Sequence, residues 1–152
     1  MNRPGFKVTP TLRKKINKLA KNVGCPLNWR RAPGVQWNGE DVACKTQDAS
    51  NIIHDIAHFM LSSKKEREHF DFGLGAGPES ESVSFEFEDE LKRIYSHAKC
   101  QSKEVRASAL GIYWEKKMGL PWEKTMRYHA WDDGELERAW EKLRYRIKKS
   151  GI

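Results

Sequence analysis

Two histidines and an aspartate between residues 51 and 60 are the side chains of this sequence best arranged to do chemistry. His54 and His58 are four positions apart, so on a helix they lie one turn apart on the same face. Two imidazoles in this arrangement can place nitrogens on one metal ion and so form half of a tetrahedral zinc site. Asp55 offers a carboxylate that can act as the general base toward water at that metal. The spacing therefore indicates a metal-dependent hydrolytic site with Asp55 as its catalytic residue.

The segment that carries these residues has the pattern of an amphipathic helix that follows a turn-rich region. Its apolar residues fall on one arc at about 100° per residue, and they are Ile52, Ile53, Ile56, Ala57, Met60 and Leu61. Asp48 can cap this helix, which we expect over residues 49–63. Before it, alternating apolar residues around Asn38-Gly39 predict a β-hairpin over residues 25–47. An ordinary core helix with two polar histidines explains the same pattern, and this alternative stays open.

The run from His54 to His58 resembles the H-E-x-x-H helix of the zincin metalloproteases, with Asp55 where that family has Glu. The order of elements is also distantly similar to that of the small repressor-cleaving and antirestriction zincin domains. The resemblance implies one zinc ion, a protein or peptide substrate and peptidase-like activity. Asp is one methylene shorter than Glu, which removes about 1.5 Å of reach. We therefore expect weakened peptidase activity, or a role for Asp55 in orienting a ligand.

A zincin site needs a third protein ligand, and Glu104 is the first choice. A third histidine six residues after His58 is excluded, because position 64 is Lys. Glu104 starts a segment at 104–118 whose apolar residues predict a buried helix. It shares a face with the small residues Ala107, Ser108 and Gly111, which allow a close approach to another helix. The Glu-x-x-Ala pattern also resembles the third-ligand helix of the repressor-cleaving zincins. A surface glutamate at a helix start is the alternative, and the other candidate ligands are Glu86, Glu88, Glu90 and His97.

The same residues also resemble a second class of enzyme. His54-Asp55 is similar to the His-Asp dyad of HD-domain phosphohydrolases, which are all-helical and bind divalent metals. That family requires another histidine upstream, and no histidine precedes His54. Its downstream aspartate would be Asp132 or Asp133, but Asp-Asp-Gly is more typical of a helix cap. The HD-type phosphohydrolase is kept as an alternative.

A binding function is the alternative from a different class. Residues 1–39 hold nine Lys and Arg and no Asp or Glu, whereas residues 40–152 hold nineteen basic and twenty-one acidic residues. Such a basic segment attracts polyanions, and aromatic side chains among guanidinium groups are typical of single-stranded nucleic-acid binding. The candidate residues are Arg13, Lys14, Lys15, Lys18, Lys21, Arg30 and Arg31, with Trp29 and Trp37 among them. In this interpretation the chain binds nucleic acid or a protein and the His pair is structural; a basic helix packed on the acidic stretch 79–90 is the other explanation.

The composition of the chain limits the classes of protein to which these hypotheses can apply. The chain has 152 residues, of which 38% are hydrophobic and 32% charged, as expected of one folded domain. No apolar run approaches the roughly 18 residues of a membrane span, and the start of the chain has no apolar signal core. The three cysteines are scattered, without a C-x-x-C pair, which argues against a disulfide scaffold and a cysteine-based zinc site. We therefore expect a cytoplasmic protein that does not associate with membranes.

Together these patterns predict an α+β, helix-rich single domain over residues 1–152, with a small β-hairpin or sheet before the metal-binding helix. A basic N-terminal helix is expected within 1–24, capped at Thr9-Pro10-Thr11 and ending at Gly24. The hairpin is expected over 25–47 and a helical part over 48–152. Within the helical part we expect a glycine-rich loop at 69–84, and a helical pattern from 85 to 118 with a break near 100–102. A short helix at 122–131 and a last helix ending at 149 follow. The leading hypothesis for function is a zinc-dependent, peptidase-like hydrolase.

Overall fold

The computed structural model describes residues 5–75 and 92–152, which form a set of packed helices beside a very small sheet. The elements in chain order are α1 (Pro10–Val23), β1 (Leu27–Asn28), β2 (Val42–Ala43), α2 (Ala49–Leu61), the short 3₁₀ helices η1 (Glu66–Glu68) and η2 (Phe70–Gly73), α3 (His97–Lys117), α4 (Trp122–Tyr128), α5 (Asp133–Lys142) and α6 (Arg144–Ser150). This is the helix-rich α+β class expected from the sequence. None of the described helices combines the length and the apolar character that crossing a bilayer requires.

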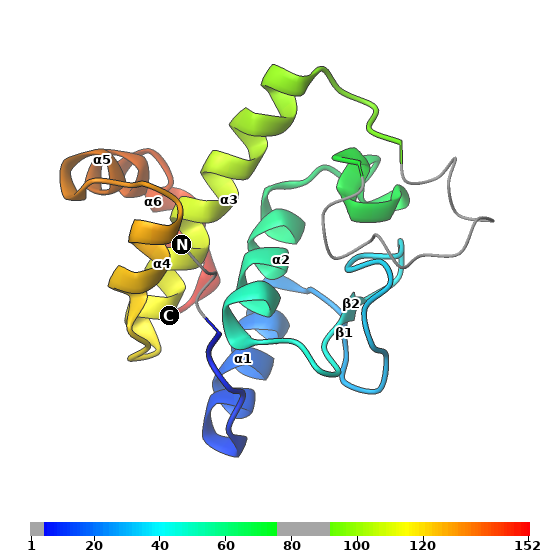
Figure 1. Ribbon diagram of the computed structural model, residues 1–152, viewed down its shortest axis with the longest axis horizontal. Helices are drawn as coiled ribbons and strands as arrows, with labels where there is room; N and C mark the ends of the chain where they lie inside the picture. The colour runs from blue at the N-terminus through cyan, green and yellow to red at the C-terminus, as the bar shows by residue number, and fades with distance from the viewer. Residues whose placement is uncertain (1–4, 76–91) are drawn as a thin grey trace.

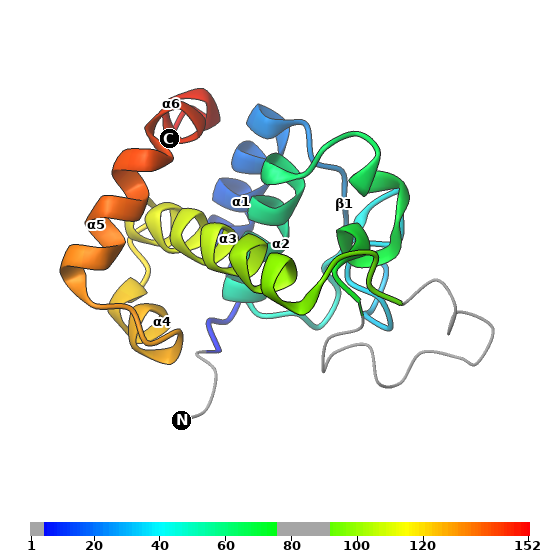
Figure 2. The ribbon, with the colours of Figure 1, turned by 90° about the horizontal axis from the view of Figure 1, so that it is seen from above.

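The helices are arranged around α2. In Figure 1, α2 lies between the sheet on one side and α3 on the other, and α4, α5 and α6 lie beyond α3. The view from above in Figure 2 shows the same order, with α1 packed along α2. The isoleucines of α2 are completely buried at Ile52, Ile53 and Ile56, so this helix is the centre of the core.

Helix α1 begins and ends where its sequence signals predict. The Thr9 hydroxyl accepts a hydrogen bond from the Leu12 amide at 3.1 Å, which caps the first turn. Gly24 ends the helix in the left-handed conformation, at φ 78°, which glycine adopts without a steric penalty. Ile16 and Leu19 are fully buried, and the lysines of α1 lie on the opposite, exposed face.

The expected hairpin over 25–47 is formed only in part. Trp37 and Val42 make a single antiparallel bridge around the Asn38-Gly39 turn. The regular sheet, however, pairs β1 with β2 in parallel, with Leu27 opposite Val42. The segment at residues 27–28, which carried no strand signal of its own, therefore supplies the partner strand, and the chain passes through a loop between the two strands.

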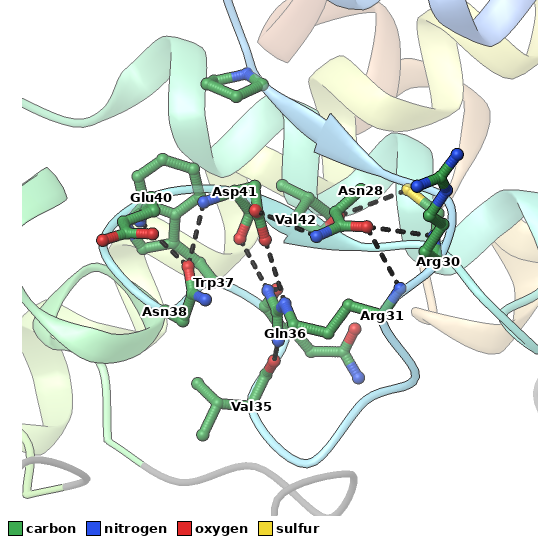
Figure 3. A network of polar contacts seen from close by, with 12 residues as sticks. Asn28, Arg30, Arg31, Val35, Gln36, Trp37, Asn38, Glu40, Asp41 and Val42 are labelled. Atoms are coloured by element: carbon green, nitrogen blue, oxygen red, sulfur yellow. Dashed lines mark hydrogen bonds and ion pairs between the residues drawn. The ribbon is translucent and has the colours of Figure 1, made fainter.

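A polar network centred on Arg31 and Asp41 fixes this loop, as Figure 3 shows. The Arg31 Nε donates to Asp41 Oδ1 at 2.9 Å, and its Nη2 donates to the Asp41 carbonyl at 2.8 Å. The Arg31 Nη1 donates to the Val35 carbonyl at 2.6 Å, and Asn28 Nδ2 donates to Asp41 Oδ2 at 3.2 Å. These bonds satisfy backbone carbonyls that the short sheet leaves unpaired.

Helix α2 starts at the predicted cap and ends slightly before the predicted end. Asp48 Oδ1 accepts from the Asn51 amide at 2.9 Å, and the helix stops at Leu61 rather than at residue 63. The first part of the expected glycine-rich loop is folded into η2, where Asp71 and Phe72 adopt left-handed conformations. Residues 76–84 of that loop, and the start of the helical pattern expected at residue 85, lie outside the described residues. Residues 92–96 are described and are not helical, so the expected helical pattern is wrong there and begins only at His97.

Helix α3 is continuous, so the expected break near residues 100–102 is wrong. The helix starts at His97 after the Ser96 cap and runs to Lys117. Cys100 keeps helical hydrogen bonding, with its amide donating to the Ser96 carbonyl at 3.0 Å. The polar residues that suggested a break lie on an exposed stretch of the helix and do not interrupt it.

Two tryptophan side chains, one from α5 and one from the turn before it, form hydrogen bonds to α3. The Trp131 indole donates to Ser108 Oγ at 3.0 Å, and the Trp140 indole donates to the Ala109 carbonyl at 2.7 Å. The single last helix expected from the sequence is divided at Leu143 into α5 and α6, although Asp132 caps its start as predicted. The short helix begins at Trp122 as expected and ends at Tyr128. This packing holds α3 in a defined position against the core.

Candidate metal centre

Residues from two helices that are distant in sequence meet at one point. Glu104 of α3 places Oε2 at 3.0 Å from His54 Nε2 and Oε1 at 2.9 Å from His58 Nε2, the two histidines of α2. One donor atom from each of the three residues lies within 4.8 Å of the others. The structure therefore brings together the three side chains that the sequence suggested as metal ligands.

Small residues of α3 permit this meeting. A Cβ atom built on Gly111 would lie 3.6 Å from the His54 Cα, so the two helix backbones nearly touch at this turn. Ala107 and Ser108, one turn earlier, are also buried. Because α3 can approach α2 this closely, the Glu104 side chain reaches both imidazoles. The close approach expected from the small-residue face is confirmed.

The electrostatics of the three residues are strongly coupled. Partial burial by itself would raise the pKa of the Glu104 carboxyl, but the charge of the neighbouring His58 and the hydrogen bond with His54 lower that pKa far below its usual range. The Glu104 side chain is 52% exposed, whereas those of His54 and His58 are only 14% and 8% exposed. The carboxylate is thus an anion held at the rim of a largely enclosed pair of imidazoles.

One of the two imidazole nitrogens is poorly satisfied by the protein alone. His58 Nε2 is buried and, although it lies 2.9 Å from Glu104 Oε1, the angle does not make a hydrogen bond. This arrangement is expected when the imidazole nitrogen and the carboxylate oxygen both point toward one metal ion and not toward each other. A buried polar atom without a partner costs about 1–3 kcal/mol, and a cation between the two groups would remove that cost.

The donor set suits zinc. Two imidazole nitrogens and one carboxylate oxygen are the ligand types of catalytic zinc sites, which keep a further position for water or substrate. Ligand atoms around a tetrahedral zinc are separated by about 3.3–3.6 Å, given bonds of about 2.0–2.2 Å. The observed separations of 2.9 and 3.0 Å between Glu104 and the two histidines need to widen only slightly to accept the ion.

Two aromatic rings from other parts of the chain lie beside the histidine pair. His129, just after α4, lies parallel to the His54 ring with centroids 5.9 Å apart. Phe72 of η2 lies against His58 at a centroid distance of 5.9 Å. Both residues reach the site through tertiary packing, and no local pattern pointed to His129.

A small cavity adjoins the centre on the His58 side. Its volume is about 20 Å³, enough for about one water molecule. Its lining combines apolar side chains with charges, and the residues are His58, Leu61, Ser62, Glu66, Phe72, Leu74, Lys103 and Arg106. Glu66 is engaged there with Lys103 Nζ at 2.7 Å and with the Tyr95 hydroxyl at 2.7 Å.

Asp55 lies beside the three-residue cluster and is not one of its members. Its side of α2 is the one that faces the sheet, where Phe59, one turn later, packs edge-on against Trp37. Burial raises the pKa of the Cys44 thiol to about 12, and the negative charge of Asp55 adds to this effect. Asp55 therefore interacts electrostatically with the buried thiols near the sheet, and its role as general base stays a prediction.

The other candidate ligands do not join the cluster. His97 begins α3 and contacts Arg93, with Nδ1 and Nη1 at 3.2 Å. Asp132, a candidate in the phosphohydrolase hypothesis, accepts from the Glu135 amide at 2.7 Å as a helix cap. Glu86, Glu88 and Glu90 lie outside the described residues.

The candidate nucleic-acid residues divide into two groups. Arg31 is committed to the internal network described above, and Trp37 is a core residue whose indole donates to the Arg67 carbonyl at 2.9 Å. Lys15 donates to the Met118 carbonyl at 3.1 Å. The remaining candidates are exposed, and they are Arg13, Lys14, Lys18, Lys21 and Arg30.

Comparison with known protein families, with curated proteins and with solved structures found no match to this chain.

Proposed function

We propose that this protein is a zinc-dependent, peptidase-like hydrolase whose ion is held by His54, His58 and Glu104. The observation that carries the proposal is the position of Glu104, whose two carboxylate oxygens lie 3.0 and 2.9 Å from the Nε2 atoms of His54 and His58. A mononuclear zinc site requires three such protein donors close together, with a fourth position left for water or substrate.

The enclosure of the histidines supports the proposal. When bound, zinc supplies a Lewis acid that polarises a carbonyl group and makes water a better nucleophile near neutral pH. His54 and His58 are mostly buried, and the aromatic rings of His129 and Phe72 restrict their motion. Glu104 is half exposed, so the side of the cluster that it borders is accessible to a substrate.

Asp55 is the proposed general base, and its side chain is one methylene shorter than that of glutamate, so it must lie closer to the water. It follows His54 directly on α2 and is partly buried. A carboxylate here takes a proton from water only if it reaches the water within hydrogen-bond distance. If it does not, the ion would be bound without rapid turnover.

The test is the metal content and thermal stability of protein purified without a histidine tag. We expect about one zinc ion per chain and a lower melting temperature after chelation, because the ion binds the native state only. His58→Ala should lose the ion and the effect of the chelator. Cleavage of a library of quenched fluorescent peptides measures the hydrolase activity, which His58→Ala should abolish.

His97→Ala is the matched control, since it removes an exposed histidine outside the cluster. It should retain the ion, the response to chelator and the activity. The proposal would be contradicted if the wild-type chain held no metal and melted at the same temperature with and without chelator. The cluster would then be explained as an ion pair between the two histidines and Glu104. A metal-loaded chain without activity on any peptide would contradict the hydrolase part alone.

A further inference from the structure

The whole net charge of the molecule belongs to the part of the chain that precedes α2. Residues 1–48 hold ten Lys and Arg against three Asp and Glu, whereas residues 49–152 hold eighteen of each. The balance of the first part, +7, equals the net charge of the protein. This part forms α1, the two strands and their loop, so the excess charge is gathered on one region of the fold.

Two of the three acidic residues of this region, Asp41 and Asp48, are engaged in local structure, and the third is Glu40. Asp41 is bound to Arg31 inside the loop network (Figure 3). Asp48 caps α2 and accepts from both the backbone amide and the side-chain amide of Asn51, each at 2.9 Å. On α1, Lys14, Lys18 and Lys21 follow one another at helical spacing along the exposed face. They form a cationic ridge, named here the α1 ridge.

An open groove borders α1 at Arg13, the residue before Lys14 of the α1 ridge. Its volume is about 600 Å³, and its lining includes the cations Lys7, Arg13 and Lys45 and the aromatic rings of Phe6 and Trp29. One carboxylate, that of Asp48, also lines it, and this carboxylate is engaged by Asn51. The guanidinium of Arg13 lies over the Trp29 ring, 4.4 Å from its centroid. The Trp29 indole is oriented by a hydrogen bond of 2.8 Å to Asn17 Oδ1 on the next turn of α1. The groove therefore combines a fixed planar cation with apolar surface.

The basic region continues onto the C-terminal helix. Asn22, at the end of α1, donates to the Ser150 carbonyl of α6 at 2.9 Å. This contact brings the last turn of α6, with Lys148 and Lys149, beside the last turn of α1, with Lys21. The cationic surface thus extends from the groove, along the α1 ridge, to the end of the chain.

We propose that this groove and the α1 ridge bind single-stranded nucleic acid, independently of the metal centre. Phosphates contact the lysines of the ridge, and bases lie on the Arg13–Trp29 stack and on Phe6. Aromatic and guanidinium planes beside a cationic track are the means by which proteins hold unpaired bases. A duplex keeps its bases stacked inside, so it gains only the phosphate contacts, and a single strand is the ligand that uses the whole groove.

The test is fluorescence anisotropy of labelled 20-nucleotide dT and rU strands and of a duplex of equal length, over a range of salt concentrations. The single strands should bind more tightly than the duplex, and the two strands together show whether the sugar is distinguished. The triple variant Lys14→Glu, Lys18→Glu, Lys21→Glu should weaken binding at least about tenfold and reduce the slope of log K against log salt by about 2, since each phosphate contact on a single strand contributes about 0.7.

The matched control is Lys64→Glu, Lys65→Glu, Lys124→Glu, which changes the net charge equally at exposed positions elsewhere. It should weaken binding less than about threefold. Arg13→Lys keeps the charge but removes the planar group, so it should weaken single-strand binding several-fold and leave the salt slope unchanged. Arg30→Lys, outside the groove, is its control and should have no effect.

Thermal melting of each variant establishes that it is folded. A wild-type protein that does not bind either strand in 50 mM salt would overturn the proposal. Equal binding of duplex and single strand, or an equal loss in the two triple variants, would also overturn it, because either result means attraction by net charge alone. Binding by the metal-free protein should match that of the metal-loaded protein, which separates this proposal from the proposed function.

Discussion

Gly111 of α3 lies against the backbone of His54, where an added Cβ atom would be 3.6 Å from the His54 Cα and 3.9 Å from Ile53 Cγ2. These are ordinary van der Waals distances, so one methyl group fits between the helices and a larger side chain does not. The spacing of α2 and α3 at this glycine decides whether Glu104 reaches the two histidines.

Substitutions at Gly111 should therefore have opposite effects according to size. Gly111→Ala should raise the free energy of unfolding by up to about 1 kcal/mol, because alanine favours the helix and meets no clash. Gly111→Leu should lower it by about 1–3 kcal/mol through overpacking, and should weaken zinc binding. Urea denaturation and zinc titration measure both quantities. Equal zinc affinity in the two variants would show that the helix spacing does not control the site.

Replacing Glu104 tests the third ligand directly. Glu104→Gln keeps the shape of the side chain but removes the charge, so zinc affinity should fall by one to two orders of magnitude. Competition with a chelating dye measures this affinity. Glu90→Gln and His97→Ala are the comparison variants, and a large loss in either of them with no loss in Glu104→Gln would move the third ligand away from Glu104.

Asp55 separates catalysis from metal binding. Asp55→Asn should abolish peptide cleavage while the zinc content stays nearly unchanged, because the three ligands are untouched. Parallel measurements of zinc content and turnover number check this prediction. Asp133→Asn, an exposed aspartate at the start of α5, is the control and should be silent. Full turnover in Asp55→Asn would exclude Asp55 as the general base.

Glu66 should make stability depend on pH in the acid range. Burial alone would raise the pKa of its carboxyl, but hydrogen bonds from Lys103, the Ser63 amide and Tyr95 lower that pKa from 4.5 to about 2. A lowered pKa in the folded state means that the stabilisation is complete above the unfolded value of 4.5 and is lost as the pH falls toward 2.

Glu66→Gln should therefore be less stable than the wild type by about 2 kcal/mol at pH 7. The difference should stay constant down to about pH 5 and shrink between pH 4.5 and 2. Urea denaturation at several pH values measures it, with Glu68→Gln, an exposed neighbour on η1, as the control. A difference that grows as the pH falls would contradict this sign.

Local signals accounted for several features of the fold. Thr9, Gly24, Asp48 and Asp132 each mark a helix end through bonds that span three or four residues, so the sequence within one turn is enough to locate them. The face shared by His54 and His58 follows from helical periodicity in the same way. These features were determined by the sequence itself, because the interactions that produce them are between near neighbours.

Tertiary packing decided the rest. Glu104 follows His58 by 46 residues, and only the contact of α3 with α2 at Gly111 brings its carboxylate to the imidazoles. The parallel pairing of β1 with β2, and the bonds from Arg31 to the Val35 and Asp41 carbonyls, join residues that no local pattern connects. His129 stacks on His54 because α4 packs against α3, not because of its own neighbours. The pair of histidines was thus evident in the sequence, while the third ligand and the surroundings of the site were settled by contacts between residues far apart in the chain.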